Sequence, residues 1–257
     1  MLSLALRTIS MLPSSSRHLR LRPNHRPSFR PFSVNMSTHT TPIEHVVLFK
    51  VKDGVDSSKV NDMLTGLNSL TSLEQVLHLT AAPVLRNCSS ASNFTHLLHS
   101  RYPSKEDLSS YSAHSAHVDV VKQFVLPICD DIMAVDWVAD ALQGPVAAPP
   151  GSALRITFLK LKENLAEEVK NEILEVIAGL REKLGPNVQL TVGENFSPGR
   201  AKGYSIASIA IFPGPKELEA ASSDPEMVEL HKEKVREHLE SVIVVDYVVP
   251  PAQTASL

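Results

Sequence analysis

This chain has few cysteines, a small net charge and no long apolar run. Its two cysteines, Cys88 and Cys129, fit neither a disulfide framework nor the spacing of a metal-binding motif. No apolar run approaches the roughly 20 residues that a membrane-spanning helix needs. A net charge of -3 provides no broad basic field that would attract nucleic acid. We therefore expect a globular protein whose partners include neither a membrane nor nucleic acid.

Acidic residues are absent before Glu44, which sets the N-terminal segment apart. Residues 1–42 carry six arginines together with many serines. An acid-free composition rich in arginine and serine is typical of a transit peptide for a plastid or mitochondrion, and the alternative is an ordinary disordered tail. Met36 could serve as a second start that omits this segment.

The C-terminus carries a weaker targeting signal. The last three residues, Ala255-Ser256-Leu257, are similar to the peroxisomal S-K-L tripeptide but lack its basic middle residue. The expected location is therefore organellar, and the sequence leaves plastid, mitochondrion and peroxisome open.

An internal repeat organises the rest of the chain. Sliding the sequence by 110 positions places Tyr204 on Phe94 and keeps three blocks of residues in register without gaps. A register kept over the length of a domain predicts two homologous copies, residues 43–139 and 153–249. The segment between them is rich in proline and glycine and is predicted to be a linker.

Each copy is predicted to follow the order β-α-β-β-α-β. Short apolar runs rich in valine indicate strands, and apolar residues at helical spacing indicate helices. Asp56 or Ser57 is expected to cap the first helix, and Ser104 is expected to cap the second. In the first copy the strands are predicted at residues 45–51, 76–82, 94–100 and 132–138, and the helices at 57–70 and 103–125.

Four antiparallel strands with two helices on one face form a ferredoxin-like unit, which leaves the other face of its sheet uncovered. Two such sheets packed face to face bury both uncovered faces and close a barrel. The repeat supplies the second sheet within the same chain, although a homodimer of two chains stays open. The predicted fold class is therefore α+β, with two tandem ferredoxin-like (βαββαβ) units forming a dimeric α/β barrel within the chain.

Three segments of the first copy resemble the stress-response A/B barrel family. Residues 45–50 (HVVLFK) are similar to the first strand of that family, and residues 135–137 (VDW) are similar to its last strand. The most specific resemblance is a helix with Tyr111, His114 and His117 in a Tyr-x-x-His-x-x-His motif. The resemblance extends over both copies and is strongest to plant members with two copies.

This resemblance implies a role in stress response, and some two-copy plant members are associated with peroxisomes. A few members of the family are enzymes, among them a polyketide cyclase and a hydroxynitrile lyase. By the resemblance, Tyr111 and His117 match the catalytic pair of the cyclase. His45 and His114 match residues that line its pocket.

The side chains in the helix motif are suited to proton transfer. The second helix is expected to be continuous, so that Tyr111, His114 and His117 spiral along one side of it. A histidine with a pKa near 6.5 can take a proton at neutral pH, and a tyrosine can donate a hydrogen bond to a developing oxyanion. This pairing would suit deprotonation next to a carbonyl, as a cyclase or lyase requires.

Two other interpretations of the motif stay open. The tyrosine and the histidines could bond to one another and to strand carbonyls, and so only fix the packing of the helix on the sheet. The same pocket could instead bind a small apolar acid without turning it over. The sequence therefore leaves undecided whether this protein is an enzyme.

Metal binding has little support in the sequence. The resemblance brings one magnesium ion, Mg2+, which in a relative lies near the end of the first helix, but residues 69–72 here include no carboxylate. His96 and His99 fall on opposite faces of a strand and are expected to be ordinary strand residues. We therefore expect that no cofactor is required.

The second copy lacks the proton-transfer groups of the first. Any acid–base site is therefore predicted for the first copy alone, with the second copy as a scaffold. Its loop 197–203 carries Arg200 and Lys202 and is expected to be a solvated hairpin, with a phosphate site as the alternative. At the positions of His45, Tyr111, His114 and His117 the second copy has Arg155, Ala221, Asp224 and Met227.

Overall fold

A computed structural model describes residues 41–89, 93–140, 142–224 and 235–251. These residues all belong to one compact unit, Thr38–Leu257. The expected transit segment as far as residue 40, with its second start, lies outside the described residues. The C-terminal tripeptide and Met227 also lie outside them.

The first copy forms a four-stranded antiparallel sheet in the order β2-β4-β1-β5. Its apolar strands alternate between two faces, so that each strand contributes to two different layers of core. The elements are β1 (Ile43–Val51), α1 (Ser57–Ser69), η1 (Leu70–Ser72), β2 (His78–Pro83), β3 (Arg86–Asn87), β4 (His96–Tyr102), α2 (Lys105–Ala113), α3 (Ser115–Val120), η2 (Val121–Val125) and β5 (Cys129–Val138).

The second copy repeats this plan in a five-stranded sheet of order β3-β9-β6-β8-β7. The prediction of two tandem ferredoxin-like units is therefore confirmed. The elements are β6 (Ala153–Leu161), α4 (Glu167–Leu184), β7 (Gln189–Glu194), η3 (Pro198–Arg200), β8 (Ile206–Phe212), α5 (Pro215–Ser222), η4 (Arg236–His238) and β9 (Leu239–Val248).

Both predicted helix caps of the first copy are confirmed. The side chain of Asp56 accepts a hydrogen bond from the backbone N of Ser58 at 2.7 Å, at the start of α1. The hydroxyl of Ser104 accepts one from the backbone N of Asp107 at 3.1 Å, at the start of α2. Each cap satisfies a backbone donor that the first turn of a helix leaves unpaired.

The predicted continuous second helix is wrong. α2 ends at Ala113, and His114 has an extended backbone (φ -63, ψ 135) before α3 begins at Ser115. Neither proline nor glycine marks the interruption in the sequence. The backbone N of Ala116 is satisfied by the His114 ring instead of by a helical carbonyl, so a side chain caps the new helix.

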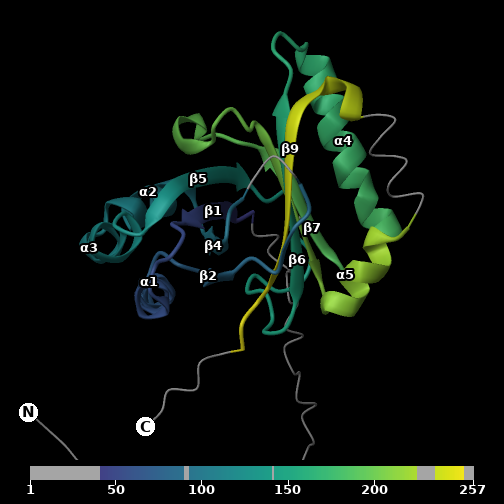
Figure 1. Cartoon of the computed structure of the whole chain (residues 1–257). Coiled ribbons are helices and arrows are strands. Elements are labelled where there is room, and N and C mark those ends of the chain that lie inside the picture. The colour runs from purple at the N-terminus through teal and green to yellow at the C-terminus, as the bar shows by residue number, and fades with distance from the viewer. Residues whose placement is uncertain (1–40, 90–92, 141, 225–234, 252–257) are drawn as a thin grey trace, which may run out of the picture. The chain divides into compact units, whose positions relative to one another are not determined.

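The two sheets pack against each other through a shared apolar core. Its members come from both copies, with Val46 and Leu97 from the first and Ile156, Ile209 and Val245 from the second. Helices α1, α2 and α3 lie against the other side of the first sheet, and α4 and α5 lie against that of the second (Figure 1). The barrel therefore closes within one chain.

In each copy, a segment also forms hydrogen bonds to the last strand of the other copy. β3, from the first copy, pairs with β9 of the second. In the opposite direction, the backbone N of Phe196 donates to Asp136 O at 3.0 Å, and Asn195 Oδ1 accepts from Asp136 N at 3.1 Å. These exchanged segments place residues of the second copy beside the helix-covered face of the first sheet.

Candidate functional site

A cavity of about 640 Å³ lies between the helix-covered face of the first sheet and the segment formed by α2, α3 and η2. Apolar side chains of β1, β4, β5 and η2 form most of its wall. Its polar groups are His45, Tyr111, His117 and Asp136, together with residues 197–200 of the second copy. The second copy is therefore more than a scaffold. A wider groove of about 730 Å³ beside α4 and β7 has neither tyrosine nor histidine in its lining.

His45 and Asp136 face each other across β1 and β5, where the register pairs them directly. His45 Nδ1 lies 2.5 Å from Asp136 Oδ1. Burial alone would raise the pKa of Asp136, but His45, a hydrogen bond from Ser197 and the charge of Arg200 hold that pKa below its usual range. The ionised carboxylate therefore accepts the Nδ1 proton and fixes the orientation of the His45 ring.

Tyr111 and His117 meet because the helix is interrupted between them. In a continuous helix, six residues would separate the two side chains by about 9 Å along the axis and about 240° around it. With the extended backbone at His114, the ring centroids of Tyr111 and His117 lie 4.7 Å apart. The interruption is thus what brings the two predicted catalytic residues into contact.

His117 has the protonation pattern of a neutral base. Its Nδ1 lies 3.0 Å from the carbonyl oxygen of Ser112, which can only accept, so Nδ1 carries the proton and Nε2 keeps its lone pair. Burial lowers the pKa of His117 most; the hydrogen bond to Ser112 opposes this, and the nearby positive charge of Arg200 adds to it. At neutral pH His117 can therefore take up a proton on Nε2.

Tyr111 lies in the cavity wall against the ring of Tyr102. The two ring centroids are 4.9 Å apart, and Tyr102 Oη accepts a hydrogen bond from Ser100 Oγ at 3.0 Å. Burial raises the pKa of Tyr111 to about 12, although the neighbouring Tyr102 hydroxyl opposes the change. The phenol is therefore protonated at neutral pH. A protonated phenol in the cavity wall can donate a hydrogen bond to a molecule in the cavity.

The structure brings together three of the four residues that the sequence singled out. His45, Tyr111 and His117 line the cavity, whereas His114 does not. The Nδ1 of His114 accepts from Ala116 N at 3.2 Å, so its role is to cap α3. Asp136 was missed as a site residue. Its only signal in the sequence was its place in a last strand that resembles the family.

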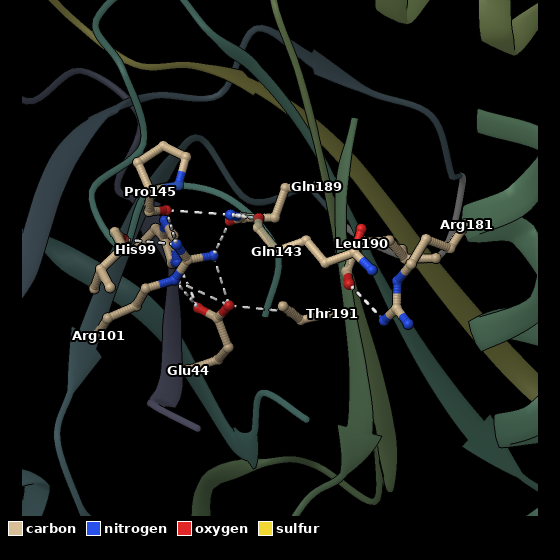
Figure 2. Close-up of polar contacts among 10 residues, drawn as sticks. Glu44, His99, Arg101, Gln143, Pro145, Arg181, Gln189, Leu190 and Thr191 are labelled. Atoms are coloured by element: carbon tan, nitrogen blue, oxygen red, sulfur yellow. Dashed lines mark hydrogen bonds and ion pairs between the residues drawn. The ribbon is translucent and has the colours of Figure 1, made fainter. Parts of the chain in front are cut away.

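A network of buried charges occupies the opposite face of the first sheet (Figure 2). Glu44, His99 and Arg101 are all fully buried there, and Glu44 bonds to Arg101 Nη2 at 2.8 Å and to His99 Nε2 at 2.7 Å. Burial would raise the pKa of Glu44, but Arg101 and His99 hold it far below its usual range. Thr191 and Gln189 of the second copy bond to Glu44 at 3.0 Å and to Arg101 at 2.7 Å. His99, expected to be an ordinary strand residue, thus belongs to a network that joins the two copies.

An ion pair occupies the equivalent place in the second copy. Arg155 and Asp246 take the positions of His45 and Asp136, with Arg155 Nε 2.8 Å from Asp246 Oδ1. Arg86, from the first copy, places a second guanidinium 2.8 Å from Asp246 Oδ2. Because arginine keeps its proton at neutral pH, this arrangement holds charge rather than moving protons.

Metal-ligating side chains do not cluster in the part of the chain that the structure describes. Within ranges 41–89, 93–140, 142–224 and 235–251, no group of three or more His, Cys, Asp or Glu side chains could hold a metal ion. At the end of the first helix, Ser69 Oγ donates to Gly66 O at 2.7 Å and Ser72 Oγ donates to Ser69 O at 2.9 Å. Magnesium is usually held by carboxylates in octahedral geometry, so this segment does not fit it.

The fold and the cavity define a class of protein, a dimeric α/β barrel with a cavity between sheet and helices. The model of the Stress responsive A/B Barrel Domain family matches residues 43–139 and 154–249. The chain belongs to this family. It is 55% identical to a stress-response A/B barrel domain-containing protein of Arabidopsis thaliana, over 97% of this chain and 93% of that protein. It is 50% identical to a second protein of the same description from the same plant, over 81% of this chain and 97% of that protein.

Solved structures agree on the fold alone. An anthrone oxidase-like protein matches with a TM-score of 0.53 at 15% identity, over 85% of this chain and 97% of that chain. A hydroxynitrile lyase from Passiflora edulis covers 41% of this chain with a TM-score of 0.37, which is too low to bear on function. No helix in the described part of the chain is long and apolar enough to cross a membrane.

Proposed function

We propose that this protein acts in stress response by binding a small apolar molecule in the cavity of its first copy. The observation that carries this proposal is the cavity itself, which has a volume of about 640 Å³ and a largely apolar wall. Small-molecule sites typically combine such a wall with a few convergent polar groups that set the orientation of the ligand. Here those groups are Tyr111, His117 and the pair formed by His45 and Asp136.

A second candidate function is catalysis, as a lyase or a cyclase acting on a carbonyl compound. The observation that favours it is the contact between Tyr111 and His117. The Tyr111 hydroxyl can donate a hydrogen bond, and His117 Nε2 can accept a proton. A hydrogen-bond donor beside a base is the combination that deprotonation next to a carbonyl uses.

The catalytic candidate has a balanced proton path. His117 Nε2 would take a proton from the carbon next to a carbonyl, while Tyr111 donates a hydrogen bond to the carbonyl oxygen as it gains charge. The carbanion would attack a second carbonyl of the same molecule, and the proton on His117 would pass to the new alkoxide. All of these transfers use side chains of this chain, and no cofactor enters them.

The binding proposal is tested by a thermal-shift screen against small aromatic acids, diketides and cyanohydrins. A ligand that fills the cavity should raise the melting temperature of wild type by several degrees, as RT ln(1 + [L]/Kd) requires. Substituting Leu98→Trp, in the cavity wall, should abolish the shift because the indole fills the space. A set of ligands that shifts neither protein would favour a purely structural role for the tyrosine and histidines.

Catalysis and binding are separated by removing the proton-transfer groups. Tyr111→Phe and His117→Gln should abolish turnover of a ligand found in the screen while changing its affinity little. Tyr204→Phe is the matched control, since it removes a hydroxyl bonded to Ser241 Oγ outside the cavity. Because the pKa of His117 lies below its ordinary value, turnover should persist as pH falls through 6.5 and decline only at lower pH. Turnover that survives both substitutions would exclude the catalytic candidate.

A further inference from the structure

Arg200 lies in the wall of the cavity although it belongs to the second copy. Within the part of the chain that the structure describes, its guanidinium forms neither a hydrogen bond nor an ion pair. Its neighbour Lys202 differs in this respect, because it is paired with Asp131 at 2.7 Å. The N–H groups of the Arg200 guanidinium are therefore available to a molecule in the cavity.

The backbone that carries Arg200 is held firmly on both sides. Phe196 N donates to Asp136 O at 3.0 Å, and Ala201 N donates to Pro198 O at 3.2 Å. Ala201 is fully buried in the core shared by the two copies. A guanidinium on a fixed backbone loses less freedom on binding than one on a loose loop.

Of the charged groups around the cavity, Asp136 has a hydrogen-bonded partner and Arg200 has none among the described residues. Asp136 is the carboxylate in the lining, and His45 already holds it at 2.5 Å. Tyr111 and His117 are neutral at neutral pH, because burial raises the pKa of the phenol and lowers that of the imidazole. An anion that enters the cavity therefore meets a free guanidinium and no carboxylate without a partner.

We infer that the cavity selects molecules with a carboxylate at one end of an apolar body, and that Arg200 of the second copy binds the carboxylate. Arginine matches a carboxylate through two parallel N–H···O bonds. With Lys202 engaged by Asp131, a single cation faces the cavity, which suits one negative charge better than a phosphate dianion. This inference rests on the proposed function and narrows its ligand to apolar carboxylic acids.

The test compares acids with neutral molecules of the same shape. Octanoate and 4-phenylbutanoate, each beside its primary amide, are titrated calorimetrically into the full chain at pH 7.5. Wild type should bind each acid about tenfold more tightly than its amide, as expected for one charge-assisted contact. Arg200→Gln should remove this preference and leave the affinity for the amides unchanged. Lys202→Gln, from the same loop, should keep the preference.

The outcomes separate this inference from the proposed function. Equal affinity of wild type for acid and amide would overturn the role of Arg200 but leave the cavity as an apolar binding site. A preference for acids that survives in Arg200→Gln would also overturn it. If none of the four probes binds, the inference and the proposed function fail together. If octanoate exceeds its amide in affinity by more than 4-phenylbutanoate exceeds its own, the apolar part of the ligand is aliphatic rather than aromatic.

Discussion

At the scale of single residues, two neighbours on β1 serve opposite faces of the same sheet. Glu44 points into the barrel, where Arg101 neutralises it and His99 bonds to it, away from any ligand. His45, the next residue, points toward the helices and pairs with Asp136 in the cavity wall. Strand alternation therefore divides buried charge into one network that holds the barrel together and one that can act on a ligand.

The Glu44 network gives the first prediction. Arg101→Ile should lower the free energy of unfolding by about 3–5 kcal/mol, because it leaves a buried carboxylate without its cation. The measurement is chemical denaturation followed by circular dichroism. A change within about 0.5 kcal/mol, typical of a surface substitution, would contradict the buried pairing.

A matched variant separates the charge from the shape of Arg101. At the positions equivalent to Glu44, His99 and Arg101 the second copy has Leu154, Ile209 and Ile211, all of them buried. A triple variant that carries these apolar residues in the first copy removes the Glu44 network as a whole and leaves none of its charges unpaired, so it should recover most of the lost stability. A triple variant as unstable as Arg101→Ile would mean that packing, and not charge, is what Arg101 supplies.

At the scale of elements, the sequence predicted what depends on local patterns. Valine-rich strands and the caps at Asp56 and Ser104 were confirmed, since each is decided by residues close in the chain. The interruption at His114 was not predicted, because no proline or glycine marks it. The pairing of His45 with Asp136 joins residues 91 positions apart, and only the strand register reveals it.

The interruption at His114 gives the second prediction. His114→Ala introduces the strongest helix former and removes the cap of α3, so the two helices should tend to merge and separate Tyr111 from His117. The ring current of Tyr111 acts on His117, whose ring protons should therefore move toward their random-coil chemical shifts in an NMR spectrum. The loss of the cap should also cost about 1 kcal/mol of stability.

A conservative change at the same position serves as the control. Asparagine is a favourable N-cap, so His114→Asn should keep α3 capped and leave the His117 shifts near those of wild type. If both variants changed the spectrum equally, the imidazole would matter for something other than capping. If neither did, the contact between Tyr111 and His117 would not depend on the interruption.

At the scale of the whole molecule, the repeat predicted that the two copies pair, but not how closely they interpenetrate. The exchanged segments, β3 on β9 and residues 195–200 beside β5, come from loops without periodic pattern. The cavity is built from both copies for this reason. The sequence assigned the site to the first copy and placed Arg200 in a separate hairpin loop, whereas Arg200 lies in the wall of that site.

A close approach between the copies, at Gly193, gives the third prediction. A Cβ atom at Gly193 of β7 would lie 2.9 Å from Trp137 Cδ1 and 3.0 Å from the carbonyl oxygen of Val138, in the first copy. Gly193→Ala should therefore lower the free energy of unfolding by about 1–3 kcal/mol, as overpacking does. Gly179→Ala, in α4, meets no atom within 4 Å and should instead raise it by about 0.5–1 kcal/mol.

The single tryptophan makes this comparison a test of how the copies unfold. Trp137 is fully buried in the first copy, so its fluorescence reports that copy, whereas circular dichroism reports both. Because the two sheets share one core, each variant should shift the fluorescence and dichroism transitions by the same amount. Gly193→Ala should shift both to lower denaturant concentration, and Gly179→Ala should shift both to higher concentration. If Gly179→Ala shifts the dichroism midpoint but leaves the fluorescence midpoint unchanged, the two copies unfold independently. The two copies could then separate while each stays folded. Because Arg200 reaches the cavity from the second copy, ligand binding at Arg200 would then require that the copies are in contact.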